Sequence, residues 1–384
     1  MRFPEFSGEW NKYTINDLAT VVGGGTPDTT VKSYWGGDIQ WFTPSEIGKN
    51  KYVDFSKRTI TRDGLDNSSA KLLPLHTILL SSRATVGECS IASNECTTNQ
   101  GFQSLIAKQC NIDFLYYLIQ TKKKDLIRNA CGSTFLEISA NEIRKIKVAV
   151  PVQNEQEQIA KLLSLIDERI ATQNKIIEKY ESLIQAISQK VLRPSEYWNE
   201  YRLCELADIR SGYSGNQVSH KTAYAVSRIE TISKHRIDML RVGYVQDIPS
   251  EYKLNVGDIL FSNINSIQYI GNTAFVDKEY NLYHGMNLLR IIPKPSLVIP
   301  RFLHLILCTS MAIKHFQSIC NKAVSQASIN QTSLGKIMLH IPPLTCQEQI
   351  CNVFESVEQR LNLEVYYLKR IQLQKNYLLR QMFI

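Results

Sequence analysis

The chain repeats itself at about half its own length, and this repeat constrains its fold more than any other feature. The tetrapeptide Gln-Glu-Gln-Ile occupies residues 156–159 and again residues 347–350, an offset of 191. An aliphatic-proline pair, Val150-Pro151 and Ile341-Pro342, precedes it at the same offset. Near the other end of each copy, WNKY at residues 10–13 matches WNEY at residues 198–201. We therefore predict a duplicated unit of about 190 residues, with pseudo-twofold symmetry within one chain.

Each copy divides again into a globular part and a helical part. The globular parts have short β-branched runs bounded by turn residues, at 77–80, 145–150 and 257–262. Each also has one helical pattern, at 114–126 and 300–316. The remainders, 155–193 and 345–384, contain no Gly or Pro before Pro194 and predict long helices. The expected order is domain 1 at 1–150, spacer helix 1 at 151–193, domain 2 at 194–341 and spacer helix 2 at 342–384.

A heptad pattern runs through both predicted helices, with apolar residues in steps of four and three. The same positions recur in the second helix after adding 191, including one polar position, Gln173 and Glu364. Lys375 is a second polar break, at the position of Ile184. The predicted seam comprises Ile159, Leu163, Ile166, Ile170, Gln173, Ile177, Tyr180, Ile184, Ile187 and Val191, then Ile350, Phe354, Val357, Leu361, Glu364, Leu368, Ile371, Lys375, Leu378 and Met382.

Chain connectivity favours an antiparallel coiled coil between these two helices. Domain 2 begins where the first helix ends, at Pro194, and ends where the second begins, near Pro342. Parallel packing would require that domain to span the whole helix, about 50 Å. The expected fold class is α+β: two pseudo-twofold-related mixed α/β domains joined by two long helices in an antiparallel coiled coil. The alternative is two amphipathic helices, each packed on its own domain, which usually shows a wider stripe of period 3.6.

Motifs of catalysis and metal binding are not found in the sequence. The chain has no GxxxxGK[ST], HExxH or GxSxG motif, and its Pro342-Pro343 pair lacks the Asn/Asp-Pro-Pro-aromatic context of a methyltransferase. We interpret the triple glycine at 23–25 as a turn. The nine cysteines form no CxxC and the seven histidines are scattered, so we expect free thiols and no metal site. With no apolar run of membrane length and no signal-peptide pattern, we expect a cytoplasmic protein.

The net charge of +8 resides mostly in the globular parts. Residues 1–150 carry +3 and residues 194–341 carry +4, whereas the helical segments 151–193 and 342–384 carry 0 and +1. Two mildly basic domains on a nearly neutral spacer suit nucleic-acid binding by the domains, although an excess of this size is common.

Together these features resemble the DNA-specificity subunit of type I restriction–modification enzymes over the whole chain. The residues that carry the resemblance are the two helix starts, the helices, and the opening of domain 1. In that opening, Gly24-Gly25-Thr26-Pro27 is followed by Trp35-Gly36-Gly37-Asp38-Ile39 and Trp41-Phe42-Thr43-Pro44-Ser45. Domain 2 departs from it, with Arg210-Ser211-Gly212-Tyr213. In such a family this difference implies that the second domain reads a different half-site.

The resemblance implies a non-catalytic chain with two target-recognition domains, each reading one half of a split, asymmetric sequence in double-stranded DNA. The helices would form the spacer and dock two modification (methyltransferase) subunits, and a restriction subunit can join them. S-adenosylmethionine would bind in the methyltransferase, and ATP and Mg in the restriction subunit, with no cofactor in this chain. Heads about one helical turn apart would leave the bases between them unspecified, so a heptad inserted into either helix should change the spacer and not the half-sites.

Candidate DNA contacts are polar residues in or beside predicted loops, since direct readout needs such groups. For each one alone, an ordinary solvated or structural role is the commoner alternative. Lys122-Lys123-Lys124 closes a predicted helix, as a phosphate contact or as C-terminal capping charge. The candidates are Lys49, Lys51, Arg83, Thr85, Thr98, Asn99 and Gln100 in domain 1, and Arg228, Lys234, Asn263, Asn265 and Gln326 in domain 2.

Two rival interpretations stay open on the residues alone. A coiled-coil adaptor without a DNA role would show no salt-sensitive duplex binding. A self-contained nuclease or methyltransferase with unrecognised motifs would be active as the purified chain, given metal or methyl donor.

Overall fold

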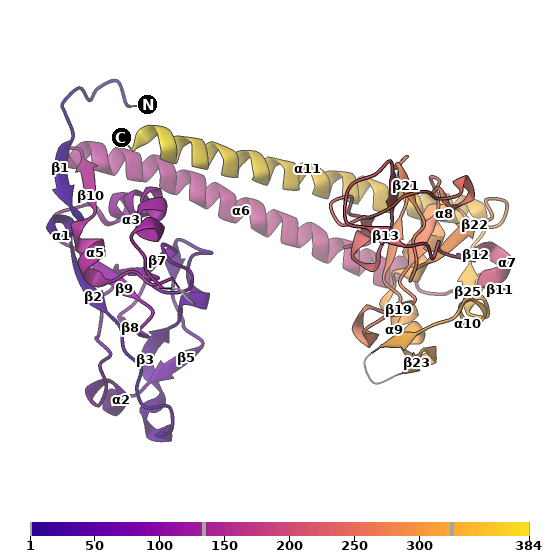
Figure 1. The fold of residues 1–384 in the computed structure, drawn as a ribbon, viewed down its shortest axis with the longest axis horizontal. Coiled ribbons are helices and arrows are strands. Elements are labelled where there is room, and N and C mark those ends of the chain that lie inside the picture. Colours follow the sequence, from indigo (N-terminus) through magenta and orange to yellow (C-terminus); the bar gives the residue numbers. More distant parts are fainter. Residues whose placement is uncertain (1, 133–135, 323–325, 384) are drawn as a thin grey trace. The chain divides into compact units, whose positions relative to one another are not determined.

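In the computed structural model of the chain, residues 2–132, 136–322 and 326–383 are described. The chain forms two compact units, one made of Met1–Lys175 and Val365–Ile384, the other of Ile176–Glu364. The two long helices, α6 (Gln153–Val191) and α11 (Leu344–Met382), each contribute residues to both units. Each unit therefore contains one globular domain and a part of each long helix (Figure 1).

The first unit is built from a five-stranded sheet of order β2-β9-β6-β7-β4, a three-stranded sheet of order β5-β3-β8, and the pair β1-β10. Helices α3 and α5 pack into the same apolar core as strands β2 and β6. In chain order the elements are β1 (Asn11–Thr14), α1 (Ile15–Leu18), β2 (Ala19–Gly23), β3 (Trp35–Phe42), β4 (Tyr52–Val53), β5 (Arg58–Ile60), α2 (Arg62–Asp66), β6 (Ile78–Leu80), β7 (Cys89–Ala92), β8 (Cys96–Thr98), β9 (Gln103–Ala107), α3 (Ile112–Thr121), α4 (Lys123–Arg128), α5 (Ala140–Lys145) and β10 (Lys147–Val150).

The second unit has a six-stranded sheet of order β12-β22-β18-β20-β16-β15, a four-stranded sheet of order β13-β17-β14-β21, a three-stranded sheet of order β19-β24-β23 and the pair β11-β25. Its elements are β11 (Asn199–Arg202), α7 (Leu203–Leu206), β12 (Ala207–Ser211), β13 (Gln217–Val218), β14 (Tyr224–Val226), β15 (Ile232–Ser233), β16 (Arg236–Ile237), β17 (Gly243–Val245), β18 (Ile259–Phe261), β19 (Ile264–Asn265), β20 (Thr273–Phe275), β21 (Leu282–Tyr283), β22 (Leu289–Pro293), α8 (Pro300–Leu307), α9 (Ser310–Ile319), β23 (Asn321–Lys322), β24 (Ala327–Ser328), α10 (Gln331–Gly335) and β25 (Met338–Ile341).

The sequence repeat is visible in the strand order. The run β2-β9-β6-β7 of the first unit corresponds to β12-β22-β18-β20 of the second. The closing pairs are also equivalent: Asn11 lies opposite Val150 in β1-β10, and Asn199 lies opposite Ile341 in β11-β25. The WNKY and WNEY matches therefore lie at the first strand of each domain, which pairs with the last strand before the long helix. The predicted α+β fold of two equivalent domains is confirmed.

The long helices pair antiparallel, and each unit shows this separately. In the first unit, Ile159 near the start of α6 shares one core with Leu378 and Met382 near the end of α11. In the second, Ile184 near the end of α6 packs on the core that holds Ile350 near the start of α11. Figure 1 shows the start of α6 beside the end of α11 in the first unit. The antiparallel prediction is confirmed.

Burial along the helices follows the heptad pattern. All twenty predicted seam positions are buried or half-buried, including the polar Gln173 and Glu364. Lys375 also lies inward, where its ammonium group is 2.6 Å from an Asp167 carboxylate oxygen in the same unit. The interruption of the apolar seam by Lys375 is therefore compensated by an ion pair between the two helices.

The first glutamine of each Gln-Glu-Gln-Ile repeat fastens its helix to its domain. The buried Gln156 amide accepts from the Asn111 backbone N–H at 3.0 Å and donates to the Pro151 carbonyl at 2.9 Å. Gln347, also buried, accepts from the Ile299 N–H at 2.8 Å and donates to the Pro342 carbonyl at 2.8 Å. The repeat thus encodes the same two glutamine hydrogen bonds twice, and we call each such pair of bonds the glutamine bracket.

Two predicted helices are each interrupted in the structure. The segment predicted as one helix at 114–126 is α3 and α4, with Lys122 between them, and the segment at 300–316 is α8 and α9, with Cys308 and Thr309 between them. Thr309 caps the start of α9 by accepting from the Ala312 N–H. The lysine run 122–124 was predicted to close a helix, but it joins two: Lys122 is the C-cap of α3 and Lys123 begins α4. Lys123 also forms an ion pair with Glu88.

Candidate nucleic-acid interface and helix surface

Three separate segments of the first domain meet around the Gly-Gly-Thr-Pro opening. The Gly25 N–H donates to the Thr98 carbonyl at 2.8 Å, and the Thr26 and Gln100 side chains are hydrogen-bonded. The loop after β6 joins them, since the Ser82 N–H donates to the Gly101 carbonyl at 2.8 Å. Candidates far apart in sequence, Arg83 and Thr85 on one loop and Asn99 and Gln100 on another, thus come from adjoining loops.

The packing explains why glycine stands in this opening. A Cβ atom on Gly24 would lie 2.1 Å from the Asn99 carbonyl oxygen, and one on Gly25 would lie 2.3 Å from the Ala70 nitrogen. The segments at Asn99 and at Ala70 therefore approach the Gly24-Gly25 backbone more closely than a side chain would permit. The approach at Gly24 fixes the loop that carries Asn99 and Gln100.

Exposure separates the first-domain candidates. Lys49, Arg83, Thr85 and Gln100 are exposed and Asn99 is half-buried. Thr98, in contrast, is 1% exposed, so its side chain is not at the surface. We leave Thr98 out of the interface that we propose below.

Lys51 is engaged inside the protein. Its ammonium group lies 2.7 Å from an Asp113 carboxylate oxygen and 2.6 Å from the Ser164 hydroxyl on α6. The same Asp113 accepts a hydrogen bond from Tyr52, and partial burial together with that bond raises the Tyr52 pKa. Lys51 thus ties its loop to α3 and α6, and we also leave it out of the interface.

In the second domain the candidates divide in the same way. Arg228, Lys234 and Gln326 are exposed, whereas Asn263 and Asn265 are half-buried. The amide groups of both asparagines donate within the domain, Asn263 to the Ile329 carbonyl at 3.3 Å and Asn265 to the Ser262 hydroxyl at 3.3 Å. Because Asn265 pairs with Ala327 in β19-β24, Gln326 lies beside the asparagine loop.

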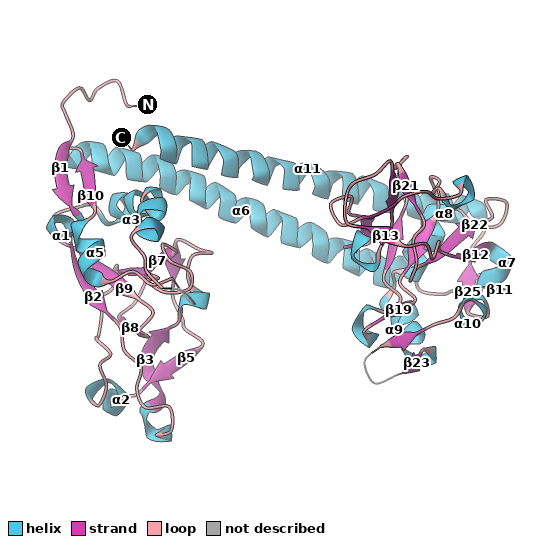
Figure 2. Cartoon of the chain, in the orientation of Figure 1, coloured by secondary structure: helices cyan, strands magenta, loops and turns pink. Residues whose placement is uncertain are grey.

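An arginine that the sequence analysis did not select is held on an aromatic face. The Arg58 guanidinium carbon lies 3.6 Å from the centre of the Trp35 ring, on the antiparallel pair β3-β5. The Trp41 ring stands perpendicular to Trp35 at 5.0 Å, and its indole N–H donates to the Gly25 carbonyl at 2.9 Å. Figure 2 shows β3 and β5 at the end of the first unit away from α6. The tryptophans were visible in the sequence, but their pairing with Arg58 depends on strand register.

The C-terminal half of α11 presents an uncovered apolar stripe. Tyr366, Leu373 and Tyr377 are separated by seven and four residues and therefore share one helix face. Their exposed fractions are 54%, 55% and 54%. Large exposed apolar residues gathered on one face are typical of a protein–protein contact.

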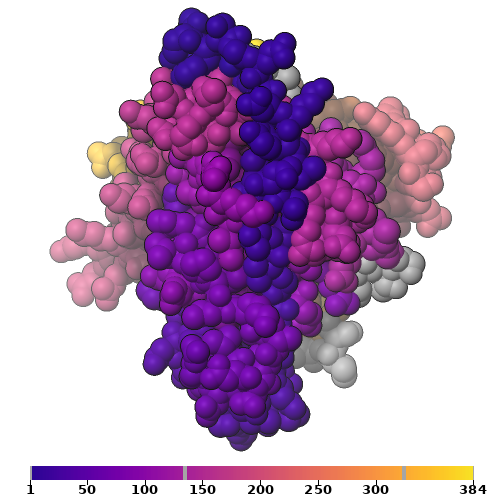
Figure 3. Space-filling model, turned by 90° about the vertical axis from the view of Figure 1, so that its left-hand side faces the viewer, coloured from indigo at the N-terminus to yellow at the C-terminus, as the bar shows by residue number. Residues whose placement is uncertain are grey.

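The N-terminal residues pack back onto the start of the long helix. Arg2 Nε and Nη2 each donate to a Glu155 carboxylate oxygen at 2.6 Å, and this fully buried carboxylate also accepts from the Trp10 indole N–H. In the space-filling view of Figure 3 the N-terminal segment, in indigo, lies against segments from later in the chain. The pair neutralises a carboxylate that burial would otherwise destabilise.

These features define a class: a protein with two equivalent α+β domains, each presenting polar loops, and two long helices that pair antiparallel. The model of the type I restriction modification DNA specificity domain matches residues 7–182 and 195–372. The chain belongs to this family, with two copies of its domain, which confirms the resemblance found in the sequence.

Individual relatives agree with this assignment. The chain is 40% identical over 182 residues to the type I restriction enzyme MjaIX specificity subunit of Methanocaldococcus jannaschii, a match that covers 44% of this chain and 41% of that protein. The matched region thus spans less than half of this curated relative.

Two solved structures share the fold across nearly the whole chain. One is the S subunit of a type I restriction-modification system from M. genitalium, with a TM-score of 0.59, 16% identity, and coverage of 100% of this chain and 99% of that one. The other comes from work on complex assembly and conformational transition of the type I R-M system, with a TM-score of 0.63, 14% identity and 98% coverage of both chains. In the part of the chain described here, no helix is long and apolar enough to cross a membrane.

Proposed function

We propose that this chain is the sequence-reading subunit of a type I restriction–modification complex in the cytoplasm. Each domain contacts one half of a bipartite, asymmetric target in double-stranded DNA, and the bases between the halves are unspecified. The observation that carries this proposal is the duplication itself: two family domains with different loop residues, each fastened by the same glutamine bracket to an antiparallel helix pair. Two different readers joined in one chain suit an asymmetric target in two parts.

The reading surface we propose in the first domain is the group of adjoining loops that carries Arg83, Thr85, Asn99 and Gln100, with Lys49 as a phosphate contact. In the second domain it comprises Arg228, Lys234 and Gln326, beside the asparagine loop. Exposed arginine and amide side chains are the groups that form bidentate hydrogen bonds with guanine and adenine in the major groove. Arg58, pre-oriented by the Trp35 ring, adds a further cation to the first surface.

The first test of this surface is Arg83→Ala. We expect relaxed specificity at one position of one half-site and an unchanged second half-site, because a good bidentate contact contributes about 1–3 kcal/mol of discrimination. Methylated-motif sequencing with the modification partner measures this. Lys145→Ala, an exposed cation at the end of α5, is the matched control and should leave both halves unchanged. Relaxation of both halves together would contradict one reader per domain.

The partners we propose are two modification (methyltransferase) subunits docked on the helices, with restriction subunits able to join. Methylation and cleavage then reside in the partners, which hold S-adenosylmethionine, ATP and Mg, and this chain supplies no catalytic group. The uncovered stripe Tyr366, Leu373 and Tyr377 supports a protein partner on α11. Aromatic residues are the commonest anchors of such interfaces.

For the helix surface we predict that Leu373→Glu weakens association with the modification subunit at least about tenfold, since it places a charge in an apolar contact. Co-purification and titration by calorimetry measure the affinity. Gln374→Glu adds the same charge at the neighbouring exposed position and should have little effect. Equal losses in the two variants would count against the stripe as the docking face.

The rival adaptor function predicts that the assembled complex shows no salt-sensitive binding of duplex DNA. Our proposal predicts steep salt dependence, and loss of Lys49 should lower the slope of log affinity against log salt by about 0.9. A flat salt profile of the assembled complex would favour the adaptor.

A further inference from the structure

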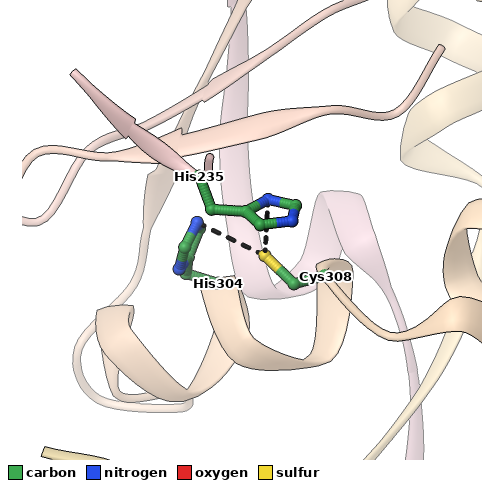
Figure 4. A group of neighbouring side chains, drawn as sticks. All are labelled: His235, His304 and Cys308. Atoms are coloured by element: carbon green, nitrogen blue, oxygen red, sulfur yellow. Dashed lines mark hydrogen bonds between the residues drawn. The ribbon is translucent and has the colours of Figure 1, made fainter. Parts of the chain in front are cut away.

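Three potential metal ligands from two distant segments meet in the second domain. His304 and Cys308 lie on one face at the end of α8, four residues apart, and His235 reaches them from the turn between β15 and β16 (Figure 4). The Cys308 sulfur is 3.4 Å from His235 Nδ1 and 3.4 Å from His304 Nε2. All three ligand atoms lie within 4.8 Å of one another.

The two nitrogen–sulfur separations match a tetrahedral metal site. With Zn–S near 2.3 Å and Zn–N near 2.0–2.1 Å, tetrahedral angles place ligand nitrogen and sulfur atoms about 3.6 Å apart. Both nitrogen–sulfur distances are within about 0.2 Å of this value. Imidazole and thiolate are also the ligands that zinc prefers, and the spacing of four residues places two of them on one helix face.

The hairpin that supplies His235 has an unusual turn. Lys234 and His235 have φ angles of 49° and 61°, so both central residues occupy the left-handed region. Tight turns of this kind favour Asn-Gly, and Lys-His costs conformational energy there. The strands on either side have only two residues each, Ile232–Ser233 and Arg236–Ile237. A bond from His235 to an ion would hold this short hairpin on the domain.

From this geometry we propose that His235, His304 and Cys308 form a binding site for Zn²⁺ or a similar divalent transition metal, with the fourth position open to water. On binding, the Cys308 thiol releases its proton to solvent and the sulfur becomes a ligand as thiolate, while each imidazole donates a nitrogen lone pair. The ion joins the β15-β16 hairpin to α8.

One neighbouring cation sets a condition for binding. Arg301 Nη1 donates to His304 Nδ1 at 2.8 Å, which places the imidazole proton on Nε2. For Nε2 to bind a metal, this proton must move to Nδ1 and Arg301 Nη1 must turn away. Arg301 can do so without losing its charge partner, because its Nη2 lies 2.5 Å and 2.6 Å from the two Glu358 oxygens. The paired Glu358 also offsets the guanidinium charge near the ion.

The test uses the purified full-length chain titrated with Co²⁺ and then with Zn²⁺. We expect one Co²⁺ per chain, with the thiolate-to-cobalt charge-transfer absorption and the strong visible bands of tetrahedral cobalt, both removed by Zn²⁺. Cys308→Ser should abolish the charge-transfer band, and His235→Asn should weaken binding about a hundredfold or more. Because His235 is exposed, its replacement leaves the core of the domain intact.

Matched controls use side chains of the same kind outside the cluster. Cys204→Ser and His315→Asn remove exposed residues and should change neither band nor affinity. The proposal is overturned if no charge-transfer band forms in the wild type, or if the band persists in Cys308→Ser. Circular dichroism of each variant separates loss of the ligand from loss of the fold.

Discussion

Lengthening both long helices by one heptad is expected to lengthen the unspecified run between the two half-sites while leaving both half-sites unchanged. The insertion we suggest duplicates residues 170–176 in α6 and residues 361–367 in α11, which are equivalent segments starting at seam positions Ile170 and Leu361. Each helix gains about 10 Å, the length of about three base pairs. Because the heptad phase is kept, the seam stays intact along both helices.

The physical basis of this expectation is the pairing of each helix start with the other helix end. The core of each unit contains the start of one long helix and the end of the other, so insertion in both helices preserves both cores. Replacing residues 170–176 by a copy of 177–183 changes the sequence without changing the length, and it should leave the spacer unchanged. Motif sequencing of methylated DNA gives the spacer length directly. A spacer of the original length in the double-insertion variant would contradict the measuring role of the helices.

Gln347→Leu is expected to destabilise the second unit by about 2–4 kcal/mol, because it leaves buried backbone groups without partners. The Gln347 side chain is fully buried, accepts from the Ile299 N–H and donates to the Pro342 carbonyl. Leucine has nearly the same size, so the loss arises from hydrogen bonding and not from a cavity. Gln156→Leu should have the same effect on the first unit, where it leaves the Asn111 N–H unpaired.

Differential scanning calorimetry of the full chain measures this effect, since the glutamines belong to different units. Each variant then serves as the control for the other unit. Gln349→Leu and Gln158→Leu, at exposed positions two residues further along each helix, should change stability little. If Gln347→Leu and Gln349→Leu melted alike, the bracket would have no energetic role.

The large-scale architecture was predictable because periodic and repeated sequence patterns determine it. The heptad seam requires only that apolar residues recur in steps of four and three, and the repeat places the same helix after each domain. Antiparallel packing followed from chain connectivity, because domain 2 begins where the first helix ends and ends where the second begins. The helix breaks at Lys122 and Thr309 were missed, because continuous apolar patterns such as residues 114–126 do not show where a local cap interrupts them.

The local site was less predictable, since its contacts join residues distant in sequence. Lys51 looked like a loop cation, but its partners Asp113 and Ser164 lie on α3 and α6. Thr98 was chosen as a polar residue beside a predicted loop, yet it is buried against the Gly24 backbone. The triple glycine is also not the predicted turn, since Gly23 ends β2 and no turn is assigned at Gly24 or Gly25. His304 and Cys308 show helical spacing in the sequence, but nothing local indicates that His235 joins them. Such placements depend on strand register and tertiary packing.

The most direct test of two readers in one chain is the methylated motif of a host that carries this chain and its modification partner, compared with the same host lacking the chain. We predict a motif that appears only with the chain and has two short specified segments, different in sequence, separated by a fixed number of unspecified bases. A single continuous motif, or an identical set of methylated sites in both hosts, would contradict the account.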